Sequence, residues 1–299
     1  MSKPSKKLSL DKKHNLTGWV FLTPGALLIF FMSFVPMIKA LILSFKTGNG
    51  GALSWADPIF RNYSQMFKDT VFIQSIKNTF FYLIIQVPIM LILALILASI
   101  LNNKNLRFKG AFRTMIFLPC ATSLVAYATV FRTLFANNGL VNLVLTKIGI
   151  LSQPYSFLTH VWSARIIIVL ALLWRWTGYN MVFYLSGLQN IEYSVYEAAK
   201  IDGASPMQTF FKITVPLLKP TILLTAIMST NGTLQLFDES VNLTDGGPAN
   251  ASITMSHYIY NMSFKYVPKF GYAAAMSFLI LILVAILAFV QMKVGDKRD

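Results

Sequence analysis

Long apolar segments separated by polar stretches dominate this sequence of 299 residues. Each segment reaches the roughly 20 residues that an α-helix needs to cross the hydrocarbon core of a bilayer. Because lipid offers no partners to backbone N–H and C=O groups, each segment is predicted to be a helix. We therefore expect an all-α polytopic membrane protein whose six spans occupy residues 18–45, 79–101, 111–131, 164–186, 217–237 and 272–292. The spans form one transmembrane domain, residues 18–292, between basic tails at residues 1–17 and 293–299.

The composition excludes several other classes. Charged residues make up only 12% of the chain, about half their usual share in soluble domains. The net charge of +15 could indicate a nucleic-acid partner, but the basic residues gather at the ends of apolar segments, as topology signals do. The single Cys120 and three scattered histidines predict neither a disulfide nor a metal site. The chain has no GxxxxGK[ST] phosphate loop and no catalytic motif, so we expect neither ATP binding nor enzymatic activity.

The distribution of basic residues predicts the orientation of the chain. Six spans place both termini on one side of the membrane. Fifteen Lys and Arg residues lie in the segments on that side, against nine in the much longer segments on the other. The positive-inside rule therefore predicts that both termini and residues 187–216 are cytoplasmic. The basic N-terminus precedes an apolar run too long for a signal peptide, so the first span should remain uncleaved.

A polar island, EAAKIDGASPMQTFFKITVPLLKP, occupies residues 197–220 between two apolar segments. Its first residues favour a helix, and Gly203 favours a break. Ser205 is a good helix N-cap, and proline is favoured at the first helical position, which Pro206 occupies. The island is therefore predicted to be a helix–turn–helix at the membrane surface, shaped to be held by another protein.

This island resembles the EAA loop of the membrane subunits of ATP-binding-cassette (ABC) importers. The resemblance implies the type I ABC importer permease fold, with both termini cytoplasmic. It also implies that the loop docks into a cytoplasmic ATPase and couples it to transport. The island departs only mildly from the family pattern, with Val215 where leucine is usual. The matching positions implied to couple to the ATPase are Glu197, Ala198, Ala199, Asp202, Gly203 and Ala204.

Other motifs resemble the carbohydrate-uptake branch of this family, and its larger maltose permease subunit in particular. They are WTGYN at 176–180, QLFDE at 235–239, LTDGGP at 243–248 and GYAAAMS at 271–277. The resemblance implies a bacterial plasma-membrane subunit that imports a di- or oligosaccharide. Its implied partners are a second permease subunit, two ATPases that bind ATP and Mg²⁺, an extracytoplasmic sugar-binding protein and membrane lipid. No cofactor is expected in this chain, and no nucleic acid.

The same resemblance suggests a sugar site near the middle of the membrane. Sugars need hydroxyl and amide partners together with a flat apolar surface, which Trp174, Trp176 and Tyr179 could provide if they do not serve packing instead. Gly178 is expected to leave room for a sugar ring to approach the helix backbone. Cys120 and Leu124 correspond to contact positions in the third span. The predicted substrate-binding residues are Trp174, Arg175, Thr177, Gly178, Met181, Ser229, Thr233, Gln235 and Leu236.

Charged residues within or next to the spans leave alternatives open. A charge inside a span is costly and is usually functional. Arg175 could line the translocation pathway, or it could lock spans together through backbone carbonyls. Asp238 and Glu239 could line a gate, bind the partner permease or simply end a helix in solvent.

Three other functions compete with sugar import. An ion-coupled secondary transporter is disfavoured because no Asp or Glu lies deep in a predicted span. A membrane-embedded enzyme lacks a catalytic constellation. A permease for glycerol phosphate or another small polar solute is the third alternative. A phosphate would need clustered cations, for which Arg175 alone gives thin support.

Overall fold

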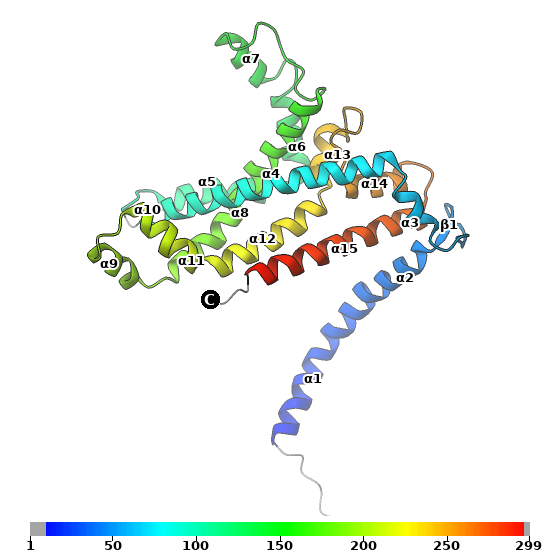
Figure 1. The fold of residues 1–299 in the computed structure, drawn as a ribbon, viewed down its shortest axis with the longest axis horizontal. Coiled ribbons are helices and arrows are strands. Elements are labelled where there is room, and N and C mark those ends of the chain that lie inside the picture. Colours follow the sequence, from blue (N-terminus) through cyan, green and yellow to red (C-terminus); the bar gives the residue numbers. More distant parts are fainter. Residues whose placement is uncertain (1–9, 104, 296–299) are drawn as a thin grey trace, which may run out of the picture.

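The computed structural model describes residues 10–103 and 105–295, and long helices dominate it (Figure 1). These helices lie side by side in a bundle. The helix formed by α1 and its continuation lies apart from the bundle over most of its length. The bundle helices are α4 (Thr70–Leu101), α5 (Lys109–Ala121), α8 (Val161–Gln189), α12 (Lys219–Leu234) and α15 (Phe270–Gly295).

Four helices are long and apolar enough to cross a membrane, and two bent helix pairs bring the number to six if each pair is one span. The first span joins α1 (Leu10–Ile29), the π-helical η1 (Phe30–Phe34) and α2 (Val35–Ser44). The six-span prediction therefore holds when the bent pairs are counted. The first helix begins at Leu10, inside the expected tail of residues 1–17, and residues 1–9 and 296–299 of the two tails lie outside the described part of the chain.

The third and fifth spans are both bent. α5 and α6 (Leu124–Leu134) meet at an angle of 98°. Thr122 and Ser123 between them have extended backbone angles, which end the helical hydrogen bonding. The second bend, of 67°, lies at Leu218, between the short helices that precede it and α12.

The second span begins nine residues earlier than predicted, at Thr70 rather than residue 79. Asp69 caps α4, because its Oδ1 atom accepts hydrogen bonds from the backbone N–H groups of Val71 and Phe72. A carboxylate at this position satisfies two of the free N–H groups of a helix start. Hydropathy alone does not detect these additional polar turns.

One end of the bundle, which we call the loop end, carries the predicted helix–turn–helix (Figure 1). It consists of α9 (Tyr193–Ile201), α10 (Pro206–Thr209), the π-helical η2 (Phe210–Thr214) and α11 (Val215–Leu217). The C-terminal end of α15 points toward the same end.

The opposite end, which we call the cap end, consists of short elements between the long helices (Figure 1). A two-stranded antiparallel hairpin is followed by one short helix, and two more helices with a π-helical turn follow α12. A further helix, α7 (Leu140–Lys147), extends beyond α6 and away from the bundle. The cap elements are β1 (Lys46–Asn49), β2 (Ala52–Trp55), α3 (Arg61–Met66), α13 (Asp238–Thr244), α14 (Met255–Tyr260) and η3 (Asn261–Lys265).

Side-chain hydrogen bonds that are buried or partly buried fix the cap to the bundle. Tyr258 of α14 and Tyr272 of α15 both donate their hydroxyls to Asp69 Oδ2, at 2.7 and 2.8 Å. The Asn78 amide of α4 donates to the carbonyls of Asn250 and Ile253, both at 2.9 Å. These bonds join segments more than 170 residues apart in sequence, so the cap folds as part of the bundle.

The bundle packs most closely through α4 and α8. Ala94 and Ala98 of α4 are fully buried in one cluster with Met181 and Tyr184 of α8. Small residues allow two helix backbones to approach without a cavity. The first span behaves differently, because its apolar window has no residue buried against the described chain. The end of α2 packs on α15, but most of the first span is exposed and apolar on all sides, and such a surface faces lipid or another subunit.

Candidate substrate cavity and loop

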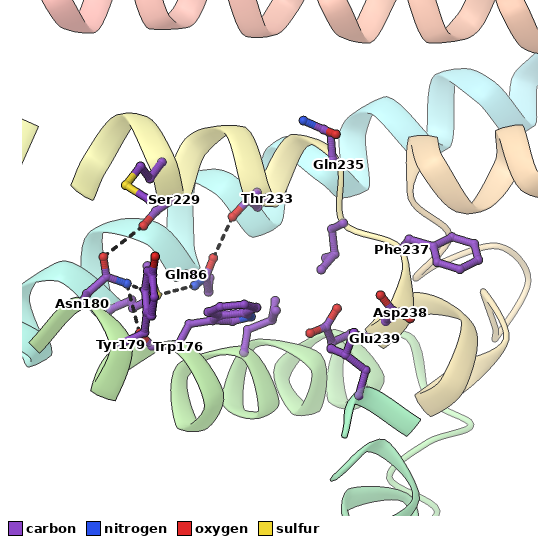
Figure 2. A pocket seen from close by; sticks show the side chains of 16 residues that line it. Gln86, Trp176, Tyr179, Asn180, Ser229, Thr233, Gln235, Phe237, Asp238 and Glu239 are labelled. Carbon is purple, nitrogen blue, oxygen red and sulfur yellow. Dashed lines mark hydrogen bonds between the residues drawn. The ribbon is translucent and has the colours of Figure 1, made fainter. Parts of the chain in front are cut away.

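A cavity of about 310 Å³ lies among α4, α8 and α12, and α13 closes one end of it (Figure 2). Its wall contains residues from five helices, because Leu124 of α6 also contributes. Polar groups converge on a site that is otherwise apolar, as in typical small-molecule sites.

Two hydroxyl–amide pairs form the polar side of the cavity. The Ser229 hydroxyl of α12 lies 3.4 Å from Asn180 Oδ1 of α8. The Thr233 hydroxyl, one turn further along α12, donates to Gln86 Oε1 of α4 at 3.1 Å. Hydroxyls and amides both donate and accept hydrogen bonds, so these pairs can exchange their mutual bonds for bonds to the hydroxyls of a ligand.

Aromatic rings form the facing side of the cavity. Trp176 and Tyr179 of α8 lie edge to face, with ring centroids 5.8 Å apart. Both rings border the cavity opposite Thr233 and Ser229 (Figure 2). A flat ring presents an apolar face of the kind on which the C–H surface of a sugar packs.

The end of the cavity next to α13 is acidic. Asp238 and Glu239 begin α13 and both contribute to the wall. Glu239 is only 3% exposed, and the Tyr127 hydroxyl of α6 donates to its Oε1 atom. Burial raises the pKa of the Glu239 carboxyl, and the hydrogen bond from Tyr127 opposes that rise. None of the described residues in the wall is a Lys, Arg or His.

Four of the nine predicted substrate residues line the cavity: Ser229, Thr233, Gln235 and Leu236. The Gln235 amide, however, points away from Trp176 (Figure 2) and donates to Asn231 at 2.5 Å. Trp176 and Tyr179, named as stacking candidates, and Leu124 also contribute to the wall.

Sequence reasoning missed two of the polar side chains in the wall. Gln86 lies in the second span and Asn180 in the fourth. The missed signal was an amide inside a long apolar run, because such a group must find a partner or a ligand within the protein.

Trp174, Thr177, Gly178 and Met181 do not line the cavity. The expectation that Gly178 leaves room for a sugar ring is wrong, because that space is filled by α5. A Cβ atom on Gly178 would lie 1.9 Å from the carbonyl oxygen of Ile116. Met181 and Thr177 are buried in helix packing. Trp174 is 46% exposed and stacks on Tyr127.

Arg175 is also absent from the cavity wall, and its contacts match the alternative in which it locks helices together. Its Nη1 atom donates to the carbonyls of Pro119 and Thr122, at 3.3 and 2.9 Å. The guanidinium also lies over the Tyr127 ring, 4.8 Å from its centroid. Arg175 therefore fixes the break between α5 and α6.

The loop end has the predicted helix–turn–helix. Gly203 has φ of +73°, a conformation that side chains disfavour, and it separates α9 from α10. Ser205 caps α10 in a reciprocal capping box with Gln208, and Pro206 occupies its first turn.

The surface of this loop is partly apolar. Ala199 is buried, whereas Glu197 and Ala198 are exposed. Large apolar side chains are also exposed here, with Ile201 85% and Met207 67% accessible. Such side chains gathered on a polar surface indicate a protein contact.

Comparisons with known proteins agree with this architecture. The chain is 47% identical to the lactose transport system permease protein LacF of Rhizobium radiobacter, over 98% of this chain and 99% of that protein. It is 30% identical to the arabinooligosaccharides transport system permease protein AraP of Halalkalibacterium halodurans, over 97% and 91% of the two chains. Its fold matches a chain of a bacterial alginate ABC transporter crystallised with an alginate pentasaccharide-bound periplasmic protein. That match has a TM-score of 0.83 and 22% identity over 98% of each chain.

Membrane-length helices around a polar cavity, with an exposed helix–turn–helix at one end, define a membrane component of a transport system. The family model for binding-protein-dependent transport system inner membrane components matches residues 90–298. The chain belongs to this family, and its fold is that of a type I ABC importer permease.

Proposed function

We propose that this chain is a permease subunit of an ATP-driven importer of di- or oligosaccharides. The observation that carries the proposal is the cavity itself, in which two hydroxyl–amide pairs face Trp176 and Tyr179. Hydrogen-bonding groups on one side and flat rings on the other suit a ligand with a hydroxyl rim and weakly apolar faces. The names of the relatives, which transport lactose and arabino-oligosaccharides, support the same substrate class.

In this proposal the cap end is extracytoplasmic and the loop end is cytoplasmic. An extracytoplasmic binding protein delivers the sugar at the cap, and a second permease subunit completes the pathway. Two partner ATPases bind ATP and Mg²⁺, and the segment from α9 to α10 transmits their movement to the bundle. The exposed Glu197 and Ile201 of α9 and Met207 of α10 suit such a contact. The membrane in which the importer lies is, in this proposal, a bacterial plasma membrane.

Glycerol phosphate fits the cavity less well than a sugar. A phosphate needs cationic or strongly donating groups, and no described residue in the wall is basic. Arg175, the cation considered as a phosphate ligand, is absent from the wall and donates instead to the carbonyls of Pro119 and Thr122.

The test is uptake into proteoliposomes that contain the complete importer with its partner subunits and binding protein. We expect ATP-dependent accumulation of labelled lactose or an arabino-oligosaccharide, and sugar-stimulated ATP hydrolysis. Replacing Thr233 with Ala should reduce sugar affinity a few-fold, because one neutral hydrogen bond contributes about 0.5–1.5 kcal/mol. Basal ATP hydrolysis should be unchanged in this variant. Uptake of glycerol phosphate without uptake of any sugar would contradict the proposal and favour a glycerol phosphate permease.

A further inference from the structure

The charged side chains in the cavity wall are all acidic. Asp238 and Glu239 lie at one end, and no described residue of the wall carries a positive charge. The guanidinium of Arg175 lies outside this wall: its Nη1 atom donates to the carbonyls of Pro119 and Thr122, and the group lies over the rings of Tyr127 and Trp176.

The two carboxylates differ in their freedom to meet a ligand. Glu239 is buried and holds the Tyr127 hydroxyl, so part of its hydrogen-bonding capacity is already used. Asp238 is half-buried. Its carboxylate receives no side-chain hydrogen bond from any residue in the described ranges, in contrast to Asp69 at the start of α4. A free carboxylate in a confined site attracts cations and donors and repels anions, and the low dielectric of its surroundings strengthens both effects.

We propose that the cavity selects sugars by charge: it admits neutral and amino sugars and rejects sugars that carry a carboxylate, sulfonate or phosphate. This inference rests on the proposed function, because it assigns a substrate class to the same site. Asp238 is the residue that determines the selection, and the hydroxyl–amide pairs of Ser229 and Thr233 bind the neutral part of the ligand.

The charge can be measured without transport. Gly232 lines the cavity, and a Cβ atom added to it meets nothing within 4 Å. On a Cys120→Ser background, Gly232→Cys places a thiol in the wall, and Ser229→Cys is a second position if the first variant folds poorly. The thiolate attacks a methanethiosulfonate to form a mixed disulfide and releases methanesulfinate. Rates with trimethylammonium and sulfonate forms of the reagent are compared in the purified complex, each relative to its rate with a small free thiol.

The cationic reagent should react about tenfold faster than the anionic one, as expected for one charge within about 8 Å in partly hydrated surroundings. Asp238→Asn should bring this ratio close to one. Changes in thiol ionisation affect both reagents equally, so they cancel in the ratio. Asp245→Asn is the matched control, because Asp245 is exposed on the cap and pairs with Lys265, and it should leave the ratio unchanged. Equal rates with Asp238 intact would overturn the inference.

The second measurement uses sugars on the same complex without its binding protein. The readout is protection of the Gly232→Cys thiol from the neutral reagent N-ethylmaleimide by lactose, by its amine analogue lactosamine and by its acid analogue lactobionate. We expect half-protection by the acid to need at least tenfold more ligand than half-protection by the amine, and Asp238→Asn to reduce this difference. Equal protection by acid and amine would overturn charge selection, while protection by lactose would still support the proposed function. Failure of all three sugars to protect would overturn the sugar assignment and the inference that rests on it.

Discussion

Arg175 of α8 donates through Nη1 to the carbonyl of Thr122 at 2.9 Å, at the point where α5 ends and the chain turns by 98° into α6. A helix end inside a membrane leaves carbonyls without partners, and these must be satisfied within the protein. The guanidinium supplies N–H groups at that point, so the direction of the third span depends on a side chain of the fourth.

Arg175→Met should keep the volume of the side chain and remove its hydrogen bonds. We expect the free energy of unfolding to fall by about 2–3 kcal/mol, because buried acceptors lose a charged donor. The measurement is the midpoint of thermal unfolding of the purified permease. Arg132→Gln is the control, because Arg132 is exposed on α6, and it should change nothing. Unchanged stability with a large loss of sugar affinity would show that Arg175 lines the pathway instead.

Gly178 and Gly232 should respond in opposite ways to the same substitution. Gly178→Ala places a Cβ atom 1.9 Å from the Ile116 carbonyl, so α5 must move and thermal stability should fall. Gly232→Ala meets nothing within 4 Å, and removing a glycine from a helix stabilises it by up to about 1 kcal/mol. Unfolding midpoints of the two variants, measured side by side, test the comparison. Equal midpoints would contradict the close approach of α5 and α8.

Gly203 should tolerate asparagine better than valine. Its φ of +73° is accessible to asparagine at small cost, whereas a β-branched residue is strongly strained there. The space around it is open, so the effect is one of backbone conformation alone. If the turn couples the ATPase to the bundle, uptake should fall in the order glycine, asparagine, alanine, valine at equal membrane levels. Normal uptake by Gly203→Val would show that the turn is not needed for coupling.

The stability of the cap should fall at acidic pH. His257 is buried and accepts or donates a hydrogen bond at Ser240, and burial lowers its pKa from 6.5 to about 4, although Asp245 opposes this shift. Between these pH values the unfolded chain binds a proton that the folded chain does not. The stabilising contribution is therefore present above pH 6.5 and is lost toward pH 4, by up to about 3 kcal/mol. Unfolding midpoints should decline less steeply over this range in His257→Gln. Equally steep declines of the unfolding midpoint in the unmodified protein and in His257→Gln would contradict the prediction.

The proposed orientation can be tested by labelling. Met207 of α10 and Val267 of the cap are both exposed, at 67% and 61%. On a Cys120→Ser background, Val267→Cys should react with a membrane-impermeant maleimide in intact cells. Met207→Cys should react only after the membrane is opened. The reverse pattern would place the cap in the cytoplasm.

Local sequence signals predicted the loop end well. Gly203, Ser205 and Pro206 each determine the backbone through their own chemistry, so the helix–turn–helix could be predicted without tertiary information. Ser229 and Thr233 are four residues apart, so any helix through them places both hydroxyls on one face, as α12 does.

Features that depend on distant partners could not be predicted in this way. The break at Thr122 depends on Arg175, which lies 53 residues further along the chain. Gln86 and Asn180 lie in apolar runs, and only helix packing reveals that both turn toward α12. Gly178 was misassigned because a glycine in a span serves close helix approach as readily as ligand access.

α4 is longer than a bilayer is thick. Its 32 residues extend about 48 Å, against about 30 Å of hydrocarbon. The turns near its start carry Asp69 and Asn78, whose bonds to the cap are made to protein and not to lipid headgroups. A thinner or thicker bilayer therefore moves the membrane–water interface along α4, while the bonds of Asp69 and Asn78 still hold this helix to the cap. The permease should keep its cap and cavity geometry when a cell changes its acyl-chain length with growth temperature.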